Sequence, residues 1–226
     1  MTHVLAQILA VIHKDLLIEW RSPSRASAVF VFALGVLLLV AFAASSVDVM
    51  RRVAGGTLWL GVLLASTRSL DQSFAVEMEH GSLEGMVLWP VDPIAIYYGK
   101  AIANAIVLVT VAALLTPLVI AIYDTPLRGS VWQFAGMVIA GCGAIAAPGT
   151  LYALITARAR GASVLLPLLL LPLVMPALLA AARGTTVLFE GDAMGQAPSW
   201  LGLLVAFNAI HWSLSGLLFG RVVESP

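Results

Sequence analysis

Charged residues are scarce in this chain, and long apolar runs take their place. Of its 226 residues only 11% are Asp, Glu, Lys or Arg, whereas 61% are hydrophobic, and the mean hydropathy is +1.00. A soluble domain carries roughly a quarter charged residues, so this chain has too few polar side chains to cover a surface in water. The composition therefore predicts an integral membrane protein.

The chain also lacks the residues that several function classes need. Its net charge is zero and its only lysines are Lys14 and Lys100, which leaves no basic surface for a nucleic acid. Cys142 is the single cysteine, so an internal disulfide and a cysteine-cluster metal site are excluded. Gly99-Lys100 is followed by Ala101 rather than by Ser or Thr, so no P-loop is present to bind ATP. We expect no catalytic residue and no metal ion in this chain.

Six apolar runs have the length, or nearly the length, that a bilayer requires. A helix needs about 20 residues to cross roughly 30 Å of hydrocarbon. Helices are expected because an open sheet would leave unpaired backbone groups in lipid. The predicted spans cover residues 26–44, 53–70, 101–123, 131–156, 162–182 and 200–220. We therefore expect one all-α membrane domain over residues 1–226.

Arg and Lys are distributed unevenly between the two sets of short loops. Of the twelve cations, eight fall on one side, and the other side holds Arg51, Arg52, Arg128 and Arg183. Cations accumulate in the cytoplasmic loops of membrane proteins. Both termini are therefore predicted to be cytoplasmic, with a cytoplasmic element at 71–99 and a periplasmic loop at 183–199.

The segment before the first span has the pattern of an amphipathic helix. Apolar residues recur there at intervals of three and four, at Leu5, Leu9, Ile12, Leu16 and Trp20. We expect a helix within residues 1–25, which Pro23 ends. Two placements remain open: the helix lies in the membrane interface, or it packs against neighbouring spans on the solvent side.

Proline and glycine interrupt the fourth and fifth predicted spans. Ala147-Pro148-Gly149 is expected to break the fourth span, after three glycines that predict close helix contact at positions 136, 141 and 143. In the fifth span Pro167, Pro172 and Pro176 are each expected to remove one backbone hydrogen bond and to bend the helix. Interrupted helices line substrate paths in transporters, although simple packing explains them equally well.

The sixth span carries three polar residues at helical spacing. Asn208, His211 and Ser215 stand at i, i+3 and i+7, which predicts one shared face. These side chains can form a polar seam with neighbouring helices, or they can contact a substrate. For His211 we expect a structural or weakly modulating role.

Residues 71–99 combine acidic and apolar side chains, which suits a protein contact better than an anionic membrane surface. We expect a turn at Gly81 and a short helix from Leu83 to Trp89, capped by Ser82 and ended by Pro90. Apolar anchors inside a charged rim are typical of a docking surface. The predicted docking residues are Phe74, Glu77, Glu79, Gly81, Ser82, Leu83, Glu84 and Met86.

This stretch resembles the signature of a known family. Phe74-x-x-Glu77-x-Glu79-x-Gly81-Ser82-Leu83-Glu84 is similar to the Phe-x-x-Asp-x-x-Asp-Gly-Ser-Leu-Glu stretch of the haem exporter protein B (CcmB) family. Departures from that pattern are Glu77, His80 and Gly85. Further matches to the family are Pro90, Lys100, Ala147-Pro148-Gly149, Arg160-Gly161, Leu-Pro-Leu at 171–173 and Pro176.

The resemblance implies a six-span permease of the ABC-2 exporter type in the bacterial inner membrane. It implies a separate CcmA-like ATPase that binds ATP, CcmC-like and CcmD-like membrane partners, a second copy of this chain, and a CcmE-like haem chaperone acting indirectly. Haem is the implied substrate, in cytochrome c biogenesis. No covalently bound cofactor is expected, and the chain itself is not expected to be an enzyme. The alternative is a membrane scaffold that anchors the ATPase without transporting anything.

Overall fold

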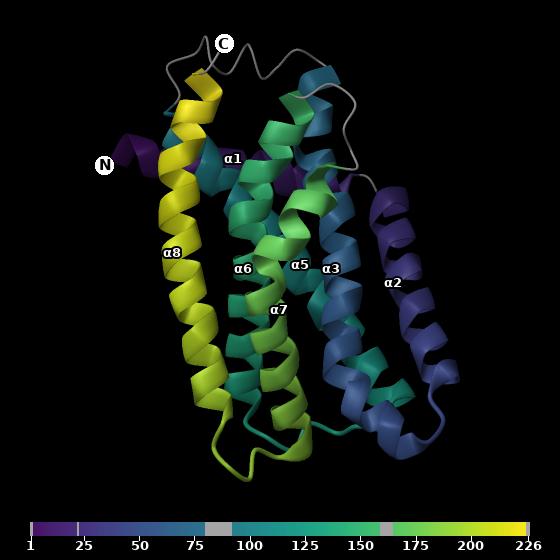
Figure 1. Ribbon diagram of the computed structural model, residues 1–226. Coiled ribbons are helices and arrows are strands. Elements are labelled where there is room, and N and C mark those ends of the chain that lie inside the picture. The colour runs from purple at the N-terminus through teal and green to yellow at the C-terminus, as the bar shows by residue number, and fades with distance from the viewer. Residues whose placement is uncertain (1, 22, 80–91, 159–164, 225–226) are drawn as a thin grey trace.

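The chain folds as a bundle of α-helices, as the computed structural model shows for residues 2–21, 23–79, 92–158 and 165–224. Figure 1 shows α2, α3, α5, α6, α7 and α8 running alongside one another, while α1 lies across them near the upper end. The predicted all-α class is confirmed for these residues. The helices are α1 (Thr2–Trp20), α2 (Pro23–Ala43), α3 (Val47–Glu79), α5 (Pro93–Ile122), α6 (Val131–Arg158), α7 (Leu165–Glu190) and α8 (Ala197–Glu224).

α6 is the central helix of the bundle. Its most apolar stretch is 78% buried, against 22% in α5, 33% in α7 and 17% in α8. It packs against α3, α5, α7 and α8, so it holds the other helices in place. The remaining helices turn much of their apolar surface outward, which is the arrangement expected of a bundle surrounded by lipid.

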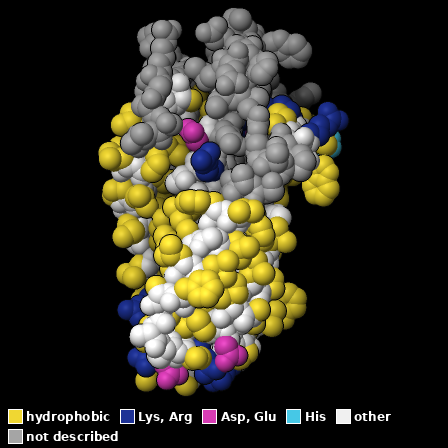
Figure 2. Space-filling view, turned by 90° about the vertical axis from the view of Figure 1, so that its right-hand side faces the viewer, with side chains coloured by type: hydrophobic (Ala, Val, Ile, Leu, Met, Phe, Trp, Pro, Cys, Tyr) yellow, Lys and Arg dark blue, Asp and Glu magenta, His cyan; other side chains and the backbone are white. Residues whose placement is uncertain are grey.

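Four helices are long and apolar enough to cross a membrane, within the part of the chain that the structure describes. They cover Pro93–Ile122, Val131–Ala157, Leu165–Glu190 and Ala197–Val223, and α2 contains a shorter apolar stretch, Phe30–Ala43. Figure 2 shows hydrophobic side chains across the middle of one face, with charged side chains gathered toward its ends. The chain is therefore a multi-pass membrane protein, while six crossings stay a prediction.

Two connections are shorter than the sequence suggested. α3 continues to Glu79 and α5 begins at Pro93, so much of the 71–99 element is helical. α7 continues to Glu190, which leaves only residues 191–196 between it and α8. Packing explains the extra turns of α7, because Thr185, Leu188 and Phe189 are buried against the rest of the bundle.

The expected break at Ala147-Pro148-Gly149 was wrong, because α6 runs without interruption from Val131 to Arg158. Pro148 removes one hydrogen bond, but residues 141–150 are buried on all sides and hold the helix together. A Cβ at Gly149 would lie 2.5 Å from Leu70 Cδ1, so this glycine serves the close approach of α3.

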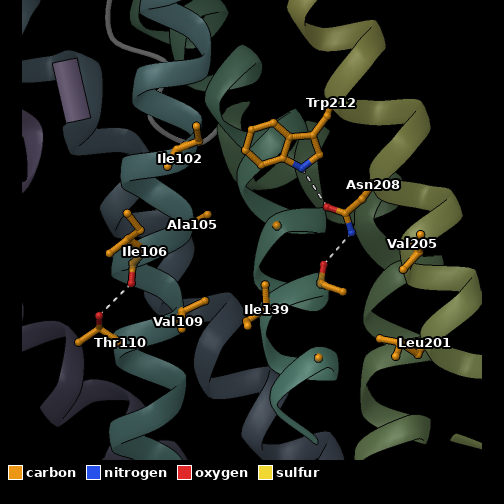
Figure 3. A pocket seen from close by; sticks show the side chains of 13 residues that line it. Ile102, Ala105, Ile106, Val109, Thr110, Ile139, Leu201, Val205, Asn208 and Trp212 are labelled. Carbon is orange, nitrogen blue, oxygen red and sulfur yellow. Dashed lines mark hydrogen bonds between the residues drawn. The ribbon is translucent and has the colours of Figure 1, made fainter. Parts of the chain in front are cut away.

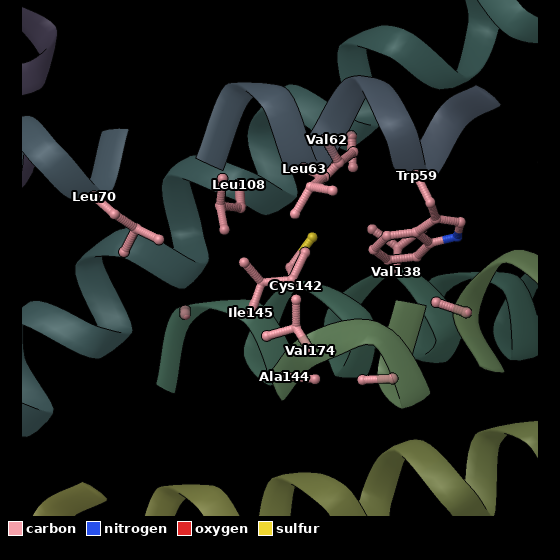
Figure 4. Packing of buried hydrophobic residues seen from close by; sticks show 14 of the residues in the cluster. Trp59, Val62, Leu63, Leu70, Leu108, Val138, Cys142, Ala144, Ile145 and Val174 are labelled. Atoms are coloured by element: carbon pink, nitrogen blue, oxygen red, sulfur yellow. The ribbon is translucent and has the colours of Figure 1, made fainter. Parts of the chain in front are cut away.

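Close contact at the glycines of α6 is confirmed. A Cβ on Gly141 would lie 2.1 Å from Cη2 of Trp59, and Trp59 is itself fixed by a 2.9 Å hydrogen bond from its Nε1 to Thr185 Oγ1. The far edge of the Trp59 indole thus lies against the backbone of α6 at Gly141. Figure 4 shows Trp59 in the same buried cluster as Cys142, which lies near Val62, Leu63 and other apolar side chains.

Candidate functional site

A buried lysine marks one end of the bundle, where α1, α3 and α5 meet. The Lys100 side chain is 1% exposed, and its Nζ lies 3.1 Å from Asp15 Oδ2 of α1. The same Nζ donates a 2.8 Å hydrogen bond to the Ser73 carbonyl of α3 and lies 4.7 Å from the centre of the Phe74 ring. A buried ammonium is stable only with such partners, because transfer of an unpaired charge out of water is costly. We call Asp15, Ser73, Phe74 and Lys100 the lysine cluster.

Local sequence places Lys100 at this position. Asp92 caps α5 by accepting a 2.9 Å hydrogen bond from Ile94 N–H, and Pro93 occupies the first helical position, which suits its missing N–H. α1 then lies directly on α5, because Gly99 has no side chain: a Cβ there would be 2.6 Å from Val11 Cβ. The glycine before the lysine therefore lets Asp15 come within ion-pair distance.

A second polar layer lies one helical turn further along α5. Asn104 Nδ2 donates a 3.0 Å hydrogen bond to Thr150 Oγ1 of α6 and lies 3.5 Å from Ser73 Oγ of α3. Thr150 in turn bonds the Ala146 carbonyl of its own helix. The lysine cluster is thus connected through Asn104 to the central helix.

Phe74 does not have the role that the sequence suggested. Its side chain is fully buried, 6.3 Å from the ring of Phe219 in α8 and in contact with the Lys100 ammonium. Phe74 is therefore a packing residue of the lysine cluster, and its ring exposes no surface that a partner protein could bind. Sequence periodicity missed this because the covering residues come from α5 and α8, far along the chain.

The other predicted docking residues belong either to the end of α3 or to the segment 80–91 that follows it in the sequence. Glu77 and Glu79 belong to the last turns of α3, although their side chains are outside the described part. The expected turn and short helix of 80–91 also lie outside it. Those predicted docking residues are Gly81, Ser82, Leu83, Glu84 and Met86.

A groove of about 740 Å³ opens between α5, α6 and α8. Small residues of α6 form its floor, namely Gly136, Ala140 and Gly143, and bulkier apolar residues of α5 and α8 form its walls (Figure 3). One end is bounded by the stacked rings of Tyr98 and Trp212, whose centres are 6.1 Å apart. Its size falls in the range of ligand pockets, roughly 300 to 1,000 Å³.

The polar groups of the groove are already engaged with one another. Asn208 donates a 2.8 Å hydrogen bond to the Ala140 carbonyl and accepts one of 2.9 Å from Trp212 Nε1, as Figure 3 shows. Thr110 bonds the Ile106 carbonyl of its own helix. Among the described residues the lining contains no Lys, Arg or His, so this part of the groove suits an apolar surface and offers no cation to a carboxylate.

Asn208 and His211 point to different neighbours, despite their helical spacing. Asn208 bonds α6, which confirms a hydrogen-bonded polar contact between helices at that position. His211 stacks on Phe207 of its own helix at 3.8 Å, and its Nδ1 lies 2.9 Å from the Phe207 carbonyl oxygen. Ser215 is buried, whereas His211 is half-buried and its contacts with Phe207 stay within α8, so His211 takes no part in the polar contact that Asn208 makes with α6.

The prolines of α7 face outward. Pro172 and Pro176 lie inside the helix and are exposed, while Pro167 lies in the first described turn. Pro148 of α6 is instead buried at the centre of the bundle. None of these prolines lines the groove between α5, α6 and α8.

Sequence reasoning overlooked the lysine cluster itself. The available signal was a lysine at the start of a long apolar run, in a chain with only one other lysine. An ionisable residue next to a membrane span is a functional candidate by default. Its partner Asp15 is 85 residues away and could not be paired with it from the sequence.

Comparison with known proteins assigns the family. The CcmB protein family matches residues 6–225. Similar proteins are the haem exporter protein B of Rhodobacter capsulatus, 33% identical over 77% of this chain and 80% of its own length, and that of Paracoccus denitrificans, 31% identical over the same shares. Haem exporter protein B of Pseudomonas aeruginosa is 24% identical over 91% of both chains. This chain belongs to the CcmB protein family.

Proposed function

We propose that this chain is the permease subunit of an ABC transporter that handles haem for cytochrome c biogenesis. It couples ATP hydrolysis by a separate subunit to delivery of haem or to release of the haem-loaded chaperone. The observation that carries the proposal is the family match over residues 6–225, together with relatives named haem exporter protein B. The membrane-spanning helices supply the permease body. The missing P-loop requires that a separate subunit hydrolyse ATP.

In this proposal the segment between α3 and α5 is the docking site of the ATPase. In the sequence, the segment lies between Glu79, the last residue of α3, and Asp92, the N-cap of α5. Acidic and apolar residues alternate within it, as expected of a partner surface. CcmC-like and CcmD-like proteins, a second copy of this chain and a CcmE-like chaperone complete the proposed assembly in the bacterial inner membrane.

A scaffold that anchors the ATPase without moving haem is the second candidate. It is favoured by the groove, whose lining has no cation to neutralise the two carboxylates of haem. Under this candidate the chain only anchors the ATPase subunit, and haem never contacts it.

Purification of a tagged chain from membranes tests the proposed function. We expect an ATPase subunit with CcmC-like and CcmD-like proteins to accompany the chain through purification. Haem added to the purified complex should stimulate ATP hydrolysis if this chain is a transporter, and leave hydrolysis unchanged if it is a scaffold. Recovery of the chain without an ATPase would refute both candidates.

A further inference from the structure

The lysine cluster joins the three elements that flank the proposed docking segment. α3 ends at Glu79, six residues after Ser73, and α5 begins at Pro93, seven residues before Lys100. α1 reaches both sides: Asp15 pairs with Lys100, and Gln7 Oε1 lies 3.4 Å from the backbone nitrogen of Asp92. A tilt of the end of α3 against the start of α5 must therefore strain contacts made by one ammonium group.

We propose that Lys100 is a positioning residue that transmits ATP-driven movement of the end of α3 and the start of α5, which flank the proposed docking segment, to the membrane helices. This inference rests on the proposed function, because it requires an ATPase docked at that segment. Lys100 acts through α1 and α3 and touches neither ATP nor substrate.

The polar contacts of the Lys100 ammonium are better suited to transmit a movement between helices than apolar contacts would be. Apolar contacts have no preferred direction, whereas a buried ammonium must keep its acceptors within hydrogen-bond distance. Lys100 has the Asp15 carboxylate at 3.1 Å on one side and the Ser73 carbonyl at 2.8 Å on the other. The ends of α1, α3 and α5 consequently move together, and Asn104 passes the displacement to Thr150 of α6.

Two variants separate transmission from simple packing. Lys100→Met removes the ammonium and keeps the length of the side chain. The double variant Asp15→Leu with Lys100→Met removes both charges, and such apolar replacement of a buried pair is often neutral for stability. Lys14→Met is the matched control, because Lys14 Nζ lies 3.0 Å from the other oxygen of the same carboxylate but is 35% exposed.

Each variant is expressed as the full chain with its partners in cells that lack their own copy. The measurements are the membrane level of the chain, the ATPase subunit recovered with it, ATP hydrolysis by the purified complex, and haem-stained c-type cytochrome. We expect the double variant to keep the first three within about twofold and to lose cytochrome about tenfold, a typical size for coupling between sites. The Lys14→Met control should match the wild-type chain in all four.

Normal cytochrome formation by the double variant would overturn the inference, since an apolar contact would then suffice. Disappearance of both Lys100 variants from the membrane would overturn it as well, because the pair would then serve folding alone. Failure of the proposed function is recognised separately, by a wild-type chain that recovers no ATPase subunit.

Discussion

Single residues decide how closely the helices approach one another. Gly141 is the tightest such position, because the rigid indole of Trp59 occupies the space of a Cβ at 2.1 Å. Gly141→Ala should lower the free energy of unfolding by about 1 to 3 kcal/mol, since neither the indole nor the backbone can move freely. Thermal unfolding in detergent measures the change.

Gly202→Ala is the matched control for that prediction, because no atom lies within 4 Å of its added Cβ. Replacement of an unencumbered helical glycine should be neutral or stabilising by up to about 1 kcal/mol. Equal unfolding temperatures for the two alanine variants would contradict the contact between α3 and α6.

Phe74→Ala should act through stability rather than through docking. The ring is fully buried against Phe219 and Lys100, so its removal leaves a cavity and should cost about 3 kcal/mol or more. Phe42→Ala is the control, because that aromatic side chain is 86% exposed on α2 and should tolerate truncation. Thermal unfolding and membrane level report the loss; release of the ATPase from a fully stable Phe74→Ala chain would restore the role predicted from the sequence.

At the scale of whole helices, two polar residues of α8 play different parts. Asn208 bonds α6, whereas His211 contacts only α8 itself. Asn208→Leu should destabilise the bundle by about 1 kcal/mol, because the hydrogen bond to the Ala140 carbonyl joins two helices. His211→Ala should change stability by less than about 0.5 kcal/mol, because its contacts with Phe207 stay inside α8.

Thermal unfolding of both variants and the amount of c-type cytochrome formed test this ranking. We expect His211→Ala to support normal cytochrome formation. Loss of cytochrome at an unchanged level of chain and complex would instead make His211 a substrate contact.

α7 remains one helix despite two internal prolines, and both are exposed on its surface. Pro172→Ala with Pro176→Ala supplies two new N–H donors for carbonyls one turn earlier and should stabilise the chain by the order of 1 kcal/mol without disturbing packing. If the transport cycle bends α7, ATP hydrolysis in response to substrate should fall in the stiffened variant.

Pro198→Ala is the control for α7, since Pro198 is an exposed proline in the first turn of α8, where no helical hydrogen bond is lost. Hydrolysis that is unchanged in both alanine variants would mean that α7 does not bend during turnover.

For the whole molecule, we predict an orientation in the membrane with both termini in the cytoplasm. Figure 1 shows α1 toward the same end of the bundle as the end of α8, as an even number of crossings requires. Met194 lies in the short connection before α8 and is 84% exposed, so Met194→Cys should react with an impermeant thiol reagent from the periplasm. Glu79→Cys should be spared.

The background for labelling is Cys142→Ala, because Cys142 is fully buried among apolar side chains and alanine brings no polar group there. Periplasmic labelling at position 79 with protection at position 194 would invert the predicted topology.

Class, membrane location and family could be predicted from the sequence because they depend on local quantities. The membrane location follows from hydropathy, which is summed over about 20 consecutive residues. The family follows from motifs such as Gly-Ser-Leu-Glu, whose residues are consecutive in the chain. Helix ends were less predictable: α7 extends to Glu190 because distant helices pack against its last turns, and α3 extends to Glu79.

Burial and pairing were decided only by the tertiary structure. Phe74 looked like a surface anchor beside acidic neighbours, yet α5 and α8 cover it. Lys100 looked like a loop cation for the orientation rule, yet α1 folds back over 85 residues of chain to bring Asp15 to its ammonium. The physical reason is that the energy of a charge or a ring depends on what surrounds it in space. The sequence alone determined a helical membrane protein of the CcmB type, and the fold decided which of its few polar residues meet.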